Sequence, residues 1–239
     1  MPAIPAGERI YAIGDIHGRL DLLDDVLARI DADDAGRRPA RTSLIFLGDI
    51  VDRGADSAGV IDRLMGLAKE KPTTRFLLGN HEEVFLLAAS GEDNAVRLFC
   101  RIGGRETILS YGISEDEYFV LSFEQLADRI VAAVPSAHLD FVRRFEDLIQ
   151  IGDYIFVHAG VRPGVALDKQ TAKDLRWIRE PFLTYRGDLP GIVVHGHTIL
   201  ADVDEQANRI GIDTGAFATG RLTALGLEGT EKWYLQSGV

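Results

Sequence analysis

The sequence predicts an α/β domain whose parallel strands end in polar clusters at one edge of a sheet. Between residues 9 and 82, apolar stretches of strand length recur, and each is followed by a glycine and a polar cluster. A stretch with helical periodicity separates each from the next, which is the βαβαβ pattern. Strands joined in this way lie parallel, so we expect the clusters to meet at one edge, where open α/β sheets place their chemistry.

Length and composition limit the classes of function. We expect a single domain over residues 1–239, a length that suits one large α/β domain. The net charge of -11 argues against binding to duplex nucleic acid, because such proteins neutralise phosphates with basic surfaces. The negative charge does not exclude substrates that contain phosphate, because bound cations would reverse the charge around the site. The single cysteine, Cys100, excludes an intramolecular disulfide and a cysteine-cluster metal site, and we expect it in a helix core.

The sequence shows no targeting or membrane segment. Residues 1–8 have neither the basic leader nor the apolar centre of a signal peptide. Apolar runs stay short of the ~18 residues that span a bilayer. We therefore expect a cytoplasmic protein without membrane contact, and the sequence leaves its oligomeric state open.

The first strand is predicted at residues 9–13, which are β-branched and aromatic. It ends in residues 14–18, where Asp15 and His17 stand two apart and can bind one cation together from an extended turn. The alternative is a helix-capping aspartate beside an incidental histidine. Leucines at helical spacing from Leu20 onward predict the helix that follows.

The second strand is predicted at residues 43–47, and a dense polar cluster follows it. Residues 48–54 hold the carboxylates of Asp49 and Asp52, then Arg53, between two glycines. Glycine permits a sharp turn and a close approach of the backbone to a ligand. For this stretch alone, the alternative is a polar surface turn in which Asp52 pairs with Arg53.

The third strand is predicted at residues 74–78. The helix before it is expected to begin at an N-cap, Ser57, and to end near residues 69–72. The strand ends in Gly79-Asn80-His81-Glu82, a third polar cluster. Asn80 and His81 should therefore join the edge at which the first two strands end.

Residues 83–152 change character and predict a helical cap. Helical pieces are expected at residues 84–89, 95–100, 123–134 and 141–149, with a further helix starting at Pro135. His138 is isolated on a polar face, so we expect it at the surface or in a helix cap. We expect the cap to select the substrate.

Strands resume in the last third of the chain. They are predicted at residues 154–157, 192–194, 209–213 and 222–227, the last two as antiparallel strands around residues 214–216. Histidines follow two of these strands: His158, and the pair His195 and His197. Five of the six histidines thus lie in strand-end clusters, a placement that scattered core histidines would not favour.

Collected at one edge, these side chains predict a site for two cations. The candidate ligands carry oxygen and nitrogen without sulfur: Asp15, His17, Asp49, Asn80, His158 and His197. Mixed ligands suit manganese, iron or zinc better than calcium or magnesium. We expect two divalent cations, with Mn2+ as the first choice. Two-metal sites of phosphatases and nucleases hold a nucleophilic water and phosphoryl oxygens together.

The neighbouring polar residues fit the other roles of phosphoryl transfer. Arg53 offers a planar fork for phosphate oxygens. His81 follows a proposed ligand and would face the substrate, where it could protonate a leaving oxygen. Asp52 could bond the other ring nitrogen of His81 and so fix its tautomer.

Five motifs together resemble the calcineurin-like metallophosphoesterases, in the order of that family. They are Gly14-Asp15-Ile16-His17-Gly18, residues 48–54, Gly79-Asn80-His81-Glu82, His158-Ala159-Gly160 and Gly196-His197-Thr198. The second and third, with residues 176–179 and 212–216, are similar to the phosphoprotein phosphatase branch, particularly the small bacterial and phage serine/threonine phosphatases. The resemblance spans most of the chain except about residues 83–152. It implies a four-layer α-β-β-α sandwich of two mixed sheets flanked by helices.

The resemblance also implies a role for each motif residue. Asp15 and His17 would hold the first metal, Asn80, His158 and His197 the second, and Asp49 would bridge the two. His81 would be the general acid with Asp52 as its partner, while Arg53 and Arg179 would bind the substrate phosphate. His195, at the end of its strand, is expected in the core or behind the ligands.

We therefore expect a metal-dependent phosphomonoesterase that hydrolyses phosphoserine and phosphothreonine in proteins by direct attack of a metal-bridging hydroxide. The alternative is a dinucleoside polyphosphate hydrolase of similar fold and metals, which residues 158–160 and 171–174 resemble. Asp52 and Glu82 argue against it, because that branch usually has alanine and aspartate at these two positions. A non-catalytic binding module is a third interpretation, disfavoured because none of the proposed ligands or acid residues is missing.

Overall fold

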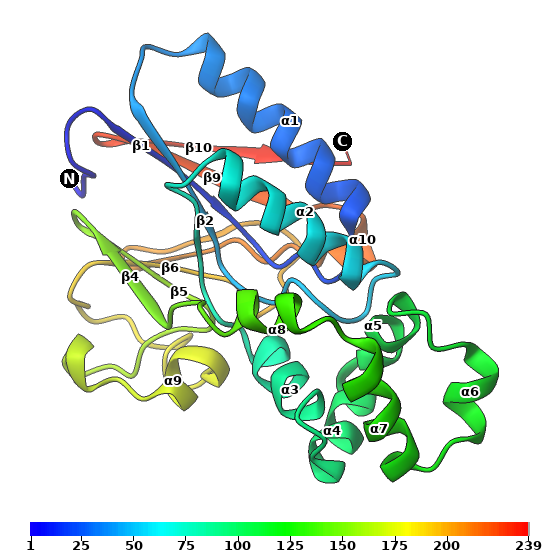
Figure 1. Ribbon diagram of the computed structural model, residues 1–239. Helices are drawn as coiled ribbons and strands as arrows, with labels where there is room; N and C mark the ends of the chain where they lie inside the picture. Colours follow the sequence, from blue (N-terminus) through cyan, green and yellow to red (C-terminus); the bar gives the residue numbers. More distant parts are fainter. Residues whose placement is uncertain (239) are drawn as a thin grey trace.

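The computed structural model describes residues 1–238, so the last residue of the predicted domain, Val239, lies outside it. Two five-stranded sheets form its centre (Figure 1). The first has the order β10 (Glu231–Gln236), β9 (Thr223–Glu228), β1 (Glu8–Ile13), β2 (Arg41–Phe46) and β3 (Arg75–Phe76). The second has the order β4 (Leu148–Ile151), β5 (Tyr154–Val157), β6 (Ile192–His195), β8 (Arg209–Gly211) and β7 (Asp204–Glu205).

Both sheets are mixed. β1, β2 and β3 run parallel, as the βαβαβ pattern predicts, while β9 and β10 pair antiparallel on the other side of β1. β5, β6 and β8 run parallel between antiparallel edge strands. Side chains alternate along β1, so Ile10 packs with Phe156 and Val194 of the second sheet, whereas Tyr11 and Ile13 pack on the side of the helices.

Helices cover the outer faces of the sheets. α1 (Leu20–Gly36) and α2 (Ser57–Glu70) lie over the first sheet (Figure 1). On the second sheet, Leu175 of α9 (Ala172–Trp177) packs with Ile155 and Val193; a 3-10 turn (Leu167–Lys169) precedes it. Two mixed sheets flanked by helices confirm the predicted fold class.

A body of helices lies between β3 and β4 in the chain and gathers beside α2 (Figure 1). It comprises α3 (Asn80–Ala88), α4 (Asp93–Ile102), α5 (Gly104–Ser110), α6 (Glu115–Val120), α7 (Phe123–Ala133) and α8 (Ser136–Val142). Phe85, Phe99 and Ile108 of these helices share one hydrophobic cluster with Val60 and Leu64 of α2. This helical insertion, residues 80–142, is therefore packed directly on the helices of the first sheet.

Three predictions about local structure are wrong. The helix expected at residues 141–149 ends by Val142, because residues 148–151 pair with β5 as the edge strand β4. The last two predicted strands belong to different sheets, β8 to the second and β9 to the first, with α10 (Ala216–Thr219) between them. α2 is capped by Asp56, whose carboxylate accepts from the N–H of Gly59 at 2.8 Å, rather than by Ser57.

His138 was expected at the surface or in a helix cap, but it is buried and makes no capping hydrogen bond in α8. Its ring forms hydrogen bonds with the Tyr111 hydroxyl at 2.9 Å and with the Asp62 carboxylate at 3.0 Å. His138 therefore connects the helical insertion to α2. Cys100 packs against the core but is only partly buried. Within residues 1–238, every helix is too short or too polar to cross a membrane.

Candidate active site

The loops after the parallel strands of both sheets lie at a common edge. The N–H groups of Ile16 and His17, after β1, donate to the carbonyl of Asp49, after β2, at 3.1 and 2.9 Å. In the second sheet, the N–H of Gly196, after β6, donates to the carbonyl of His158, after β5, at 2.8 Å. The candidate ligands are all buried: Asp15, His17, Asp49, Asn80, His158 and His197.

The backbone is strained where these loops turn. Among residues 1–238, the non-glycine residues with a positive φ are His17, Asp49, Asp52, Arg53 and His197, with φ values of 48°, 48°, 71°, 68° and 64°. The left-handed region disfavours residues with a Cβ, at a cost of about 1–3 kcal/mol each. Each of the five is a predicted site residue, so the strain is concentrated in the loops that carry the candidate site.

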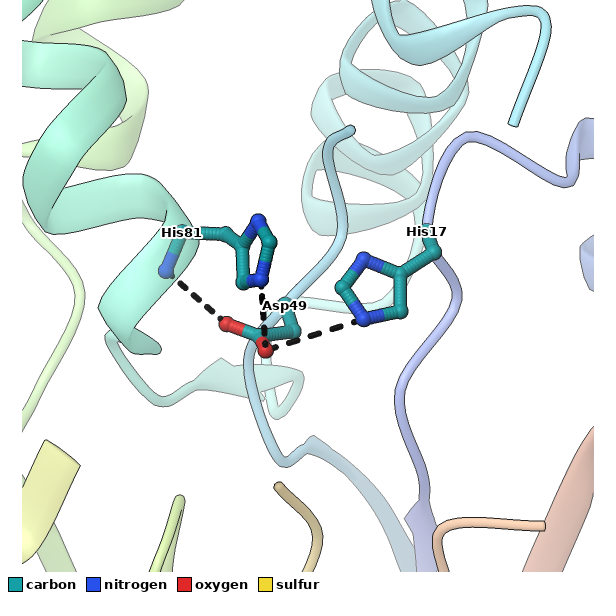
Figure 2. A group of neighbouring side chains, drawn as sticks. All are labelled: His17, Asp49 and His81. Carbon is teal, nitrogen blue, oxygen red and sulfur yellow. Dashed lines mark hydrogen bonds and ion pairs between the residues drawn. The ribbon is translucent and has the colours of Figure 1, made fainter. Parts of the chain in front are cut away.

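Asp49 lies at the centre of the cluster (Figure 2). Its Oδ2 atom is 3.7 Å from Nε2 of His17 and 3.8 Å from Nε2 of His81. Its Oδ1 atom is 3.3 Å from Nε2 of His158. Two groups could each hold a metal ion, with ligand atoms within 4.8 Å of one another: His17, Asp49 and His81, and Asp49, His158 and His197. Asp49 belongs to both groups, as a bridging carboxylate must.

Hydrogen bonds orient two of the imidazole rings. Nδ1 of His17 lies 2.8 Å from the carbonyl oxygen of Val51, and Nδ1 of His158 lies 2.8 Å from that of Leu47. A carbonyl oxygen only accepts, so both Nδ1 atoms carry a hydrogen. In the neutral form of each ring, Nε2 would then be the nitrogen that binds a cation. A backbone carbonyl on the far nitrogen is the usual second contact of a metal-binding histidine.

Two further predicted ligands have polar atoms without a partner. Oδ1 of Asp15 and both ring nitrogens of His197 are buried and lack a hydrogen bond within the described residues. Burial, together with the charges of Asp213 and Asp49, raises the pKa of Asp15 well above its usual range. Buried carboxylates in such proximity are costly unless a cation neutralises them, so the donor set fits divalent cations.

Asp15 approaches the second sheet at Gly196. A Cβ at Gly196 would lie 1.9 Å from Oδ1 of Asp15, so only glycine lets these two loops come together. In the group around His17 and Asp49, the third side chain within ligand distance is His81. The motifs predicted Asp15 in that place.

α3 begins with Asn80 and His81 and aims both into the site. Oδ1 of Asn80 lies 3.0 Å from Nε2 of His158. Nδ1 of His81 lies 2.6 Å from Oδ2 of Asp52, which is fully buried. Burial works to lower the pKa of His81, but the carboxylates of Asp49 and Asp52 outweigh it and raise the pKa above its usual value.

The guanidinium group of Arg53 contacts the rings of both His17 and His81. Its Nη1 and Nη2 atoms are 3.0 Å from Nε2 of His17 and 3.0 Å from Nε2 of His81. A guanidinium group only donates, so both Nε2 atoms accept. The guanidinium also lies 4.8 Å from the ring centre of Phe217, whose ring is 5.4 Å from that of His17. These contacts hold a cationic fork inside the site, as binding of a phosphate group requires.

Arg179 and His195 differ in exposure. Arg179 is exposed after α9, and its charge adds to burial and the charge of His158 in lowering the pKa of His197 to about 3. His195 is fully buried, with its ring 5.0 Å from that of Phe182. It therefore lies in the core, one of the two places expected for it.

Glu82 and Asp213 also belong to the site, although neither was among the predicted ligands, acid residues or phosphate-binding residues. The buried carboxylate of Glu82 accepts from the N–H groups of Gly79, Asp49 and Ile50 at 2.9, 2.7 and 2.8 Å, which ties the loop after β2 to the start of α3. A glutamate at the third position of a helix is a capping signal that could have indicated this. Asp213 has a buried Oδ2 atom without a partner among residues 1–238, and its place at the end of a predicted strand was the available signal.

Comparisons with known proteins found relatives that match most of the chain. The chain is 27% identical over 238 residues to the asymmetrical bis(5'-nucleosyl)-tetraphosphatase PrpE of Anoxybacillus flavithermus, covering 89% of this chain and 88% of that protein. It is 30% identical over 184 residues to the symmetrical bis(5'-nucleosyl)-tetraphosphatase of an Acidovorax species, covering 77% of this chain and only 51% of that protein. It is 28% identical over 219 residues to serine/threonine-protein phosphatase 1 of Salmonella typhimurium, covering 90% and 89%.

A solved structure and a family model extend the comparison. The crystal structure of a candidate diadenosine tetraphosphatase shares the fold, with a TM-score of 0.67 at 21% identity and 99% coverage of both chains. The sequence model of the calcineurin-like phosphoesterases matches residues 8–222, a range that contains every predicted site residue. The chain therefore belongs to the calcineurin-like phosphoesterase family, a family of metal-dependent phosphoester hydrolases.

Proposed function

We propose that this chain hydrolyses dinucleoside polyphosphates by cleaving a bond between two of their phosphates. The observation that carries the proposal is the similarity, along 89% of the chain, to a protein named as a bis(5'-nucleosyl)-tetraphosphatase. A second relative of that name matches 77% of the chain. The motifs alone favoured phosphoproteins over dinucleotides, and these relatives favour the opposite order.

The side chains at the strand ends are proposed to bind two divalent cations, and manganese is the first metal to test. The proposed ligands are Asp15, His17, Asp49, Asn80, His158 and His197. Cations bound there would neutralise charge on the phosphoryl oxygens and activate a water molecule. The net charge of the chain is -11, so the overall electrostatic field of the protein repels a polyphosphate. Any attraction for the polyphosphate has to come from groups at the site itself.

Arg53 and His81 are proposed to act on the phosphate and on the leaving oxygen. In the structure Arg53 donates to Nε2 of His81, and Asp52 accepts from Nδ1 of the same ring. A phosphate group that accepted from Arg53 would take over this contact and leave Nε2 of His81 to carry a proton to the leaving oxygen. Asp52 would keep the ring oriented and stabilise its charged form.

A phosphoserine or phosphothreonine protein is the second candidate substrate, and the contact between Asp52 and His81 favours it. The leaving group of these esters is a strongly basic alkoxide, whereas cleavage of a polyphosphate releases a weakly basic phosphate. A proton donor contributes most when the leaving oxygen is strongly basic. The Salmonella relative is named as a serine/threonine-protein phosphatase, which agrees with this candidate.

A competition between the two substrates tests the proposal. Purified protein with added manganese is offered diadenosine tetraphosphate and a phosphothreonine peptide at equal concentration, and kcat/KM is measured for each. The Asp49→Asn variant, purified in the same way, measures contaminating phosphatase. We expect kcat/KM to be higher for the dinucleotide by ~10-fold or more, which is about 1.4 kcal/mol in transition-state binding. A margin of that size for the peptide would instead establish the second candidate.

A further inference from the structure

A buried threonine of the helical insertion contacts the partner of the proposed acid. Thr107 lies in α5, 55 residues along the chain from Asp52, and is fully buried. Its Oγ1 atom donates to Oδ1 of Asp52 at 2.7 Å and accepts from the N–H of Asp52 at 2.9 Å. One hydroxyl group thus binds both the side chain and the backbone of Asp52.

The contact completes the bonding of the Asp52 carboxylate. Oδ2 faces the ring of His81 at 2.6 Å, and Oδ1 faces Thr107, so each oxygen has a defined partner. Ser57 adds a second hydroxyl, which accepts from the N–H of Asp52 at 3.0 Å and lies 2.8 Å from Oγ1 of Thr107. Because the hydrogen of Thr107 points to Asp52, Ser57 is the donor between the two hydroxyls.

Asp52 needs such an anchor because its backbone is strained. Its φ of 71° lies in the left-handed region, which a residue with a Cβ keeps only where its surroundings impose it. The same corner of the insertion supports the next residue, since the N–H of Arg53 donates to the carbonyl of Gly103 at 2.9 Å. A Cβ at Gly103 would lie 2.7 Å from Cγ of Arg53, so this close approach requires glycine.

We propose that Thr107 is a positioning residue for the proton donor: it holds Asp52 in the orientation in which Asp52 orients His81. The helical insertion then contributes to catalysis itself, in addition to any part in selecting the substrate. The inference rests on the proposed role of His81, and its test is chosen so that a failure of that role can be recognised separately.

The test compares leaving groups of different basicity. Phenyl phosphate has a basic leaving oxygen that needs a proton, whereas 2,4-dinitrophenyl phosphate leaves readily without one, so loss of a proton donor slows the first much more than the second. The variants are Thr107→Val and Thr107→Ala, which remove the hydroxyl, and Thr107→Ser, which keeps it. Ser110→Ala is the matched control, because Ser110 lies in the same helix and bonds Ala58 of α2 without touching Asp52.

We expect Thr107→Val and Thr107→Ala to lower kcat for phenyl phosphate on the order of 10-fold to 100-fold, the usual effect of losing a supporting contact. We expect a change within about 2-fold for 2,4-dinitrophenyl phosphate, recovery in Thr107→Ser, and no selective loss in Ser110→Ala. Thr107→Val should add nothing to the loss caused by His81→Asn, because both would act through one proton transfer.

Other outcomes distinguish the proposed role of Thr107 from the proposed role of His81. Equal losses for both substrates, or additive losses in the double variant, would show that Thr107 supports the fold and overturn the inference. The inference also fails, with the role of His81 intact, if His81→Asn shows the selective loss and the Thr107 variants do not. If His81→Asn lacks the selective loss as well, the proposed role of His81 is wrong and the inference falls with it.

Discussion

The Nδ1 atom of His81 lies 2.6 Å from Oδ2 of Asp52 at the start of α3, and both side chains are almost completely buried. Asp52 lies in the loop after β2 and His81 in the first turn of α3, which follows β3, and these two strands are parallel neighbours. Their contact fixes the orientation of the imidazole ring. Such preorganisation is what a proton donor needs to act efficiently.

Replacing His81 with asparagine should lower turnover without removing the metals. We expect kcat to fall on the order of 10²- to 10⁴-fold, the usual contribution of a positioned proton donor. Metal content per chain, measured by elemental analysis, should stay at the wild-type value. The control is His138→Asn, since His138 is also buried but bonds Tyr111 and Asp62 instead.

A loss of bound metal in His81→Asn would contradict this prediction. His81 lies within ligand distance of His17 and Asp49, so this outcome would make it a ligand of the first cation and remove it from the role of acid.

Replacing Asp49 with asparagine should abolish both metal binding and turnover. Asp49 belongs to both groups of candidate ligands, and an amide lacks the charge to neutralise two cations. Elemental analysis and kcat measure the two effects. Asp168→Asn, at an exposed carboxylate that pairs with Lys169, should leave both at wild-type values. A variant that kept the wild-type rate would refute the bridging assignment.

Divalent cations should stabilise the fold. The carboxylates of Asp15, Asp49 and Asp213 are buried near one another, so a cation that binds them favours the folded state over the unfolded one. At a free manganese concentration about 100 times the Kd, the free energy of unfolding should rise by ~2.7 kcal/mol. Thermal melts of chelator-treated protein with and without manganese measure the rise, which Asp49→Asn should lose. An unchanged melting temperature would argue against a resident cation.

The ion network of Asp33 should make stability depend on pH. Partial burial works to raise the pKa of Asp33, but hydrogen bonds from Arg37, Tyr11 and Trp233 outweigh it and hold the pKa below its usual value of 3.8. A lowered pKa in the folded state stabilises the protein above the usual pKa, and the gain is lost as the pH falls through the lowered value.

Urea unfolding of metal-free protein tests this. We expect Asp33→Asn to lower the free energy of unfolding by about 1–2 kcal/mol near neutral pH and by less near pH ~3. Asp31→Asn serves as the control, because Asp31 lies in the same helix but pairs at the surface with Lys71. A loss in Asp33→Asn that is the same at both pH values would contradict the prediction.

The strand-end loops were predictable because their signal is local. Glycine beside Asp15 or Asp49, directly after an apolar strand, indicates a turn that presents a carboxylate, and no distant residue is needed to recognise it. β4 was missed because residues 148–151 become a strand only by pairing with β5. His138 was placed at the surface because its partners, Tyr111 and Asp62, are distant in sequence.

The residues that hold the candidate site in place were harder to predict from the sequence. Thr107 follows no strand and belongs to no recognised ligand pattern, and its contact with Asp52 depends on how the helical insertion packs against α2. The choice of substrate also depended on more than local motifs. Asp52 and Glu82 favoured the phosphoprotein interpretation. In the structure, however, Glu82 binds backbone N–H groups, so its presence reflects how the loop after β2 is held in place and does not indicate the substrate.

The position of β1 has a consequence for how the enzyme is made. β1 is translated long before its antiparallel neighbour β9; Ile13 pairs with Ala224, and the N–H of Gly14 donates to the carbonyl of Thr223 at 3.0 Å. Contacts between such distant segments form slowly, because a long loop must close first. A ribosome-bound chain would therefore carry the motifs of Asp15 and His17 without the assembled centre, and activity would begin only after β9 had been synthesised and had paired with β1.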